Sequence, residues 1–171
     1  MKKTFVPLAF VILLVSVMAV SCSKADSEST TFKVRLTDNP YNAEEVNVDI
    51  REVNVNFHDD STGWQSLNTN TGIYNLLGLQ NGVDTLLATG VIPSGSVKEI
   101  RFVLGSDNTI KIDGETYPLT IPSGSQSGLK IKLDKELNGT VDSVLIDFDA
   151  NLSVHQTGNG TYQLKPVLRV K

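Results

Sequence analysis

The chain has 171 residues, 15 basic and 19 acidic side chains, and one cysteine. This length suits one domain, and a single cysteine excludes an internal disulfide. The acidic excess leaves no basic surface of the kind that grips phosphate backbones, so we expect no nucleic-acid partner.

The first 21 residues have the parts of an export signal. Lys2 and Lys3 precede an apolar run over residues 5–20, which is shorter than the roughly 20 apolar residues that a membrane-spanning helix needs. The run ends in Ala19, Val20 and Ser21, and small residues directly before a cysteine resemble the lipobox of bacterial lipoproteins. We therefore predict a cleaved signal peptide over residues 1–21 and a lipid-modified Cys22.

Lipidation gives Cys22 a role, because an exported protein would otherwise carry an unpaired thiol. Two or three acyl chains anchor a protein durably, whereas one chain does so only marginally. Residues 22–30 are polar and predict a flexible tether. Asp26 and Glu28 within it resemble the surface-export signal of Bacteroidetes lipoproteins. We expect an outer-membrane lipoprotein, on the cell surface or the periplasmic face.

Without Lys2 and Lys3 the mature chain has 13 basic against 19 acidic side chains, a net charge of about −6. Such a surface suits solubility and argues against direct binding to anionic lipid. The expected contact with the membrane is therefore the lipid anchor alone.

Beyond residue 30, apolar side chains recur at every second position, as in strands with one packed face and one wet face. The pattern predicts strands around residues 32–36, 46–50, 53–57, 100–104, 129–133, 144–148 and 162–170. Sheets of this kind are usually antiparallel.

Three local features refine this pattern. The apolar phase shifts from even to odd positions near Arg51, which predicts a β-bulge around residues 51–53. Asp113-Gly114 predicts a tight hairpin between residues 109–112 and 115–120. Residues 73–79 and 85–89 fit either a strand or a short helical turn.

Eight or more short strands without an amphipathic helix indicate an all-β fold. We predict one antiparallel β-sandwich over residues 31–171, with its two sheets about 10 Å apart.

Stretches along nearly all of residues 31–170 resemble the bacterial family filed as domain of unknown function 4382. They are Leu36–Pro40, Gly63-Trp64, Leu76–Leu79 with Asn81-Gly82, Ile92–Gly95 before Ile100–Phe102, Ile121–Gly124 through Ser127–Ile131, Asp147–Asp149 and Leu164–Val167. The resemblance implies a lipoprotein-borne β-sandwich, transthyretin-like or immunoglobulin-like, and it implies no activity.

No catalytic set stands out. The chain has two histidines, His58 and His155, and it lacks the Gly-x-Ser-x-Gly nucleophile motif. Two distant histidines do not form a transition-metal site. We therefore expect no enzymatic activity and no cofactor.

Asp147 and Asp149 share one strand face with Asn151 at a spacing of two residues. Pairing with basic residues on a neighbouring strand is the favoured interpretation. The alternative is a calcium site that joins these two carboxylates with a loop aspartate.

Aromatic side chains are the candidates for ligand binding. Trp64, Tyr41 and Tyr117, together with Tyr74, would stack on sugar rings if they were exposed together. A lone tryptophan in a sandwich more often caps the core, which is the favoured interpretation for Trp64.

The leading hypothesis is thus a lipid-anchored, non-enzymatic module that binds a glycan or protein through loops at one end of the sandwich. The alternative is a structural or accessory subunit of an envelope assembly that pairs an exposed sheet edge with a partner strand.

Overall fold

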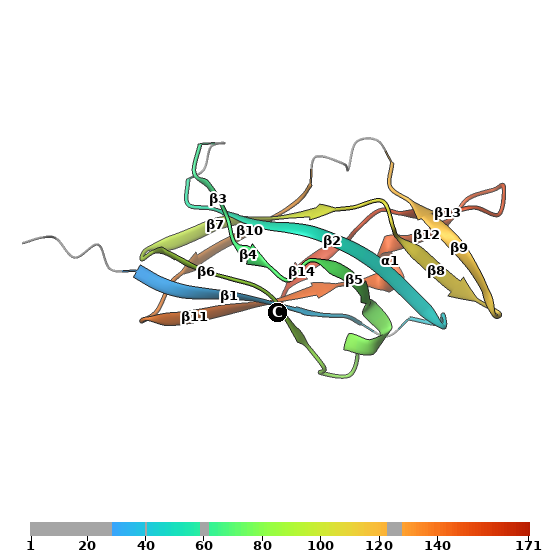
Figure 1. Cartoon of the computed structure of the whole chain (residues 1–171), viewed down its shortest axis with the longest axis horizontal. Coiled ribbons are helices and arrows are strands. Elements are labelled where there is room, and N and C mark those ends of the chain that lie inside the picture. Colours follow the sequence, from blue (N-terminus) through green and yellow to red (C-terminus); the bar gives the residue numbers. More distant parts are fainter. Residues whose placement is uncertain (1–28, 40, 59–61, 123–127) are drawn as a thin grey trace, which may run out of the picture.

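The computed structural model describes residues 29–171 except residues 40, 59–61 and 123–127 (Figure 1). The predicted signal peptide, Cys22 and most of the predicted tether lie outside the described residues. Strand β1 (Ser29–Thr37) nevertheless begins inside the predicted tether, so the sandwich starts two residues earlier than expected. The reason is that Thr30 is buried and its hydroxyl donates to the carbonyl oxygen of Gly139 at 2.9 Å.

The described strands form two layers (Figure 1). The first sheet has the order β14 (Leu168–Val170), β11 (Val141–Phe148), β1, β6 (Thr85–Pro93) and β4 (Asn68–Thr69). The second has the order β10 (Leu129–Glu136), β7 (Ser96–Leu104), β2 (Glu45–Asn56), β8 (Thr109–Ile112), β9 (Glu115–Thr120), β13 (Tyr162–Leu164) and β12 (Val154–Gln156). Strands β3 (Trp64–Ser66) and β5 (Gly72–Asn75) also pair with β2.

The all-β sandwich is confirmed, but its sheets are mixed rather than purely antiparallel. Strand β1 runs parallel to β11, and β13 runs parallel to β9. Parallel neighbours need a long crossover. Here the crossover between β1 and β11 is most of the chain and includes every strand of the other sheet except β12 and β13.

Alternating burial is the basis of the core, as predicted. On β1, Phe32, Val34 and Leu36 are fully buried, and on β11 Ile146 and Phe148 are too. They join one hydrophobic cluster with β2 and β7 residues such as Val48, Val53, Ile100 and Phe102. Burying side chains of this size is the main stabilising contribution to such a fold.

Two of the local predictions are confirmed. The pairing of β2 with β7 shifts register between Ile50 and Glu52, which is a bulge at the predicted place. Strands β8 and β9 form the predicted hairpin, and Asp113 and Gly114 both have positive φ, 50° and 80°. Such φ values are typical of two-residue turns that match the twist of the strands.

Residues 73–79 and 85–89, which fitted either a strand or a helical turn, adopt different structures. Residues 73–79 contain the end of β5 and then a single 3₁₀ turn, η3 (Leu76–Leu79), which the Asn75 side chain caps. Residues 85–89 belong to β6. No helix among the described residues is long and apolar enough to cross a membrane.

The expectation that Asn151 shares a strand face with Asp147 and Asp149 is wrong. Asn151 lies not on a strand but in the short helix α1 (Ala150–Ser153). The chain turns there because the Asp149 carboxylate accepts a hydrogen bond from the backbone N–H of Leu152 at 3.0 Å, as an N-cap.

Candidate functional site

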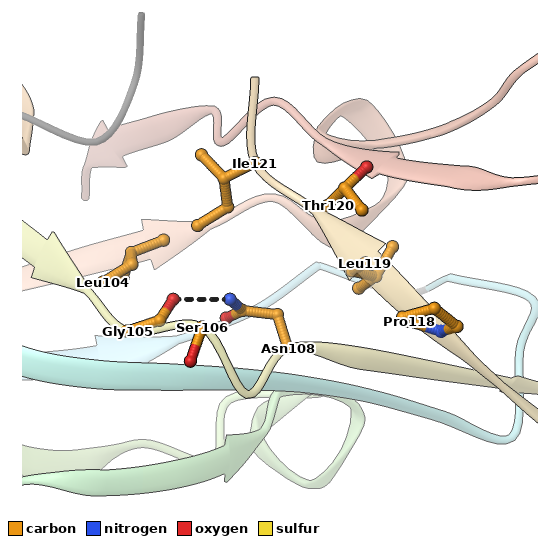
Figure 2. Close-up of a pocket in the computed structure, with 8 residues that line it drawn as sticks. All are labelled: Leu104, Gly105, Ser106, Asn108, Pro118, Leu119, Thr120 and Ile121. Atoms are coloured by element: carbon orange, nitrogen blue, oxygen red, sulfur yellow. Dashed lines mark hydrogen bonds between the residues drawn. The ribbon is translucent and has the colours of Figure 1, made fainter. Parts of the chain in front are cut away.

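A surface pocket of about 490 Å³ lies between the end of β7 and strand β9 (Figure 2). Pockets that hold small ligands have volumes of about 300–1,000 Å³. Its lining residues come from β7, the loop that follows it, β9 and the residue after β9: Leu104, Gly105, Ser106, Asn108, Pro118, Leu119, Thr120 and Ile121.

Asn108 fixes the loop that forms one wall. Its side-chain amide donates to the carbonyl of Gly105 at 2.8 Å, drawn as a dashed line in Figure 2. Its side-chain oxygen accepts from the backbone N–H of Asp49 on β2 at 2.9 Å, and its carbonyl accepts from Leu119 N at 2.8 Å. Asn108 is 2% exposed. Asn108 thus links the loop to β2 through its side-chain amide and to β9 through its backbone carbonyl.

Gly105 lets this loop lie close to β2. Its backbone N–H donates to the carbonyl of Asp49 at 2.8 Å. A Cβ at this position would lie 1.9 Å from the Asp49 carboxylate, a contact that real structures do not have. The residue that closes the loop against the sheet must therefore be glycine.

Among the residues that the structure describes, the lining carries no charged side chain. Leu104, Leu119 and Ile121 supply apolar surface. The Ser106 hydroxyl lies within hydrogen-bonding distance, 3.1 Å, of an Asp107 oxygen, and the Thr120 hydroxyl donates to the carbonyl of Tyr162 at 3.2 Å. Both hydroxyl oxygens keep lone pairs that accept hydrogen bonds. The pocket therefore suits an uncharged ligand that has apolar surface and a few donors.

The predicted aromatic residues do not meet in one place. Tyr117 packs against Tyr162, with ring centroids 5.2 Å apart, and both rings contact the core. Tyr41 lies near Tyr162, and its pKa is raised by burial and by that neighbour. Trp64 is at the other end of β2, opposite Asn56, whereas β8 and β9 lie beyond the Glu45 end. The three candidates therefore form no shared stacking platform.

Trp64 lies on the outer face of the second sheet. It pairs with Asn56 across the strands, and Asn56 alternates with the core residue Val55. The Arg101 guanidinium lies over the ring, 3.9 Å from its centroid, and the Lys130 ammonium lies 5.5 Å from it. Trp64 therefore does not cap the core, and a sugar on the ring face under Arg101 would have to displace a cation–π contact. A role for Trp64 in ligand binding stays a prediction.

Three carboxylates converge at the end of the first sheet. Asp38, Asp147 and Asp149 are at most 4% exposed. The Asn39 amide donates to Asp147 at 2.6 Å, and Asp38 accepts from Ala150 N at 2.9 Å. These residues belong to two of the stretches that carry the family resemblance, so part of that resemblance is explained by a structural joint between β1 and β11.

Burial raises the pKa of Asp38 from 3.8 to about 6. The nearby Asp147 carboxylate raises this pKa further, while hydrogen bonds from Ala150, Gln80 and Asn39 lower it. Desolvation is the dominant effect, since it disfavours the charged form.

Basic side chains in β14 and directly after it form ion pairs with the other two carboxylates. Arg169 lies 3.4 Å from Asp149, and Lys171 lies 3.3 Å from Asp147. The favoured prediction of cross-strand pairing is thereby confirmed. Among the described residues no group of three or more His, Cys, Asp or Glu is placed to hold a metal ion. Calcium binding by Asp147 and Asp149 stays an untested alternative.

The sequence alone did not predict the pocket. Gly105-Ser106-Asp107-Asn108 is a turn sequence between two strands, and that signal marks the loop. What the sequence does not show is that Asn108 is buried beneath it.

Comparison with protein families gives one match: the model described as Domain of unknown function (DUF4382) matches residues 29–166. No curated protein and no solved structure matches the chain.

Proposed function

Because the chain belongs to the DUF4382 family, whose description assigns no activity, we propose a function from its own residues. The protein is an exported, lipid-anchored component of the cell envelope. It is not an enzyme, and it binds an uncharged, partly apolar ligand in the pocket beside β9.

The observation that carries this proposal is the pocket itself. It is of ligand size, its walls are apolar or neutral, and buried hydrogen bonds of Asn108 hold its loop in position. A preformed pocket spends little binding free energy on ordering. Two sources supply such a ligand: the neutral end of a glycan, or an uncharged peptide segment.

The position of the pocket supports a role outside the membrane. Strand β1 begins at the end of the molecule opposite the β8–β9 hairpin (Figure 1). An anchor joined to Ser29 through the predicted tether leaves the half of the domain that carries the pocket directed away from the bilayer.

The test is a binding screen with a substitution that fills the pocket. Neutral oligosaccharides and uncharged tripeptides are screened by the chemical shifts of backbone amides in the ¹⁵N-labelled protein. We expect one class to shift the amides of Gly105, Ser106 and Asn108. Ser106→Trp places an indole at the mouth and removes these shifts, whereas Ser143→Trp, at an exposed serine on β11, leaves them intact.

A screen in which neither class shifts the loop amides contradicts the proposal. So does a ligand whose binding is unaffected by Ser106→Trp.

A further inference from the structure

Strand β10 is an unpaired edge of the second sheet. Among the described residues it pairs with β7 alone. An edge strand presents a row of backbone N–H and C=O groups on its free side, which is a template for another strand.

A bulge limits the usable part of this edge. The pairing of β10 with β7 shifts register between Lys132 and Lys135, and Asp134 has a φ of 44°. Bulges bend a strand and interrupt its pairing. The regular part of the edge is therefore Leu129–Lys132.

The two faces of this segment differ. Leu129 and Ile131 are half-buried, and together with Lys130 and Pro166–Leu168 they line a groove of about 270 Å³ between β10 and the start of β14. Lys130 and Lys132 are exposed on the alternate positions. A strand laid along β10 would place apolar side chains at the groove and its alternate side chains beside these lysines.

The charges of this edge are available for a partner. Lys135 forms an ion pair with Asp142, and Lys98 forms one with Asp134. Lys130 and Lys132, in contrast, form no ion pair with a carboxylate among the residues that the structure describes. Across the strands Lys130 pairs with Arg101, and Lys132 pairs with Glu99. Lys130, Lys132 and Arg101 thus outnumber the one carboxylate beside them, Glu99, on a chain with an acidic net charge.

We propose that Leu129–Lys132 of β10 accepts an extended strand of a partner protein in which acidic residues alternate with apolar ones. Backbone hydrogen bonds would supply affinity, and the groove and the two lysines would supply specificity. Lysines on an edge discourage pairing with a second copy, because they would lie opposite one another. Against an acidic strand the same charges attract. This inference is independent of the pocket.

The test uses a labelled nine-residue peptide of alternating valine and glutamate, measured by fluorescence anisotropy with the purified protein at low salt. We expect saturable binding and chemical-shift changes in the amides of Leu129–Lys132. Lys130→Glu and Lys132→Glu should each weaken binding at least tenfold. Lys33→Glu, on the outer face of β1, is the matched control and should leave it unchanged.

A charge-reversal experiment distinguishes a specific loss of binding from a variant that fails to fold. The double variant Lys130→Glu/Lys132→Glu should bind the peptide with lysine in place of glutamate, which the unaltered protein should not. Equal binding of both peptides by the unaltered protein overturns the proposal, as does the absence of binding. A concentration-dependent dimer that protects the β10 amides from hydrogen exchange would assign the edge to a second copy and equally overturn it.

Discussion

Single residues determine the shape of the pocket and of the joint between β1 and β11. Neither Gly105 nor Asn108 belongs to an apolar pattern, and the role of each depends on Asp49, which is more than fifty residues away in the chain. Sequence periodicity reports which face of a strand is buried. It does not report which loop residue is buried by a distant strand.

Gly105→Ala should lower stability by about 1–3 kcal/mol, because the new methyl group overlaps the Asp49 carboxylate and the loop must shift. Chemical denaturation measures the effect. Gly158→Ala is the control, since nothing lies within 4 Å of a Cβ there. Equal midpoints for the two variants would show that the loop does not rest on β2 as described.

Asp38 should make stability depend on pH. Its pKa is raised to about 6 in the folded protein, whereas the ordinary value is 3.8. Between these values the folded state binds the proton of Asp38 more tightly than the unfolded state does. The protonated carboxyl therefore makes its full contribution to stability below about pH 4. That effect is lost as the pH rises through 6. Unfolding curves from pH 4 to 7 should therefore show a decline that Asp38→Asn removes.

Asp142 gives the opposite dependence and serves as the comparison. Burial acts to raise its pKa, but hydrogen bonds from Asn138 and Ser143 and the ion pair with Lys135 lower it overall. The stability that this carboxylate contributes is present at neutral pH and is lost on acidification. If Asp38→Asn and Asp142→Asn changed the pH profile in the same direction, the assignment for Asp38 would be wrong.

A turn or a bulge was predictable where the local sequence alone determines it. The Asp113-Gly114 hairpin and the bulge near Arg51 follow from turn chemistry and from the phase of the apolar residues, and both are present. Helix α1 was not predictable from periodicity, because it is four residues long and forms around the Asp149 cap. The parallel pairing of β1 with β11 was also missed, since pairing between distant strands leaves no mark on the local pattern.

The β8–β9 hairpin should depend on Gly114, whose φ is 80° and whose backbone N–H donates to the Glu44 carboxylate at 2.6 Å. Gly114→Ala should cost roughly 1–2 kcal/mol, because a side chain disfavours this left-handed conformation. Gly78→Ala in the 3₁₀ turn, where φ is not positive and a Cβ meets nothing, is the control. A Gly114→Ala variant as stable as the control would contradict the turn.

At the scale of the whole molecule, apolar alternation was enough to predict two packed layers, since each strand has one face that must be covered. It was not enough to predict the candidate site. The aromatic residues selected from the sequence lie at opposite ends of the second sheet, and the pocket is lined by none of them. The loop that forms the pocket carries no apolar alternation, which is why the sequence pattern did not predict the candidate site.

The proposed location in the cell envelope depends directly on lipid anchorage through Cys22. Mass spectrometry of the membrane fraction from cells that express the full chain tests it. We predict an N-terminal peptide that begins at Cys22 and carries a diacylglyceryl group, and a Cys22→Ser variant that loses this modification. A chain that retains Met1, or a mature N-terminus with a free Cys22 thiol, would contradict the account.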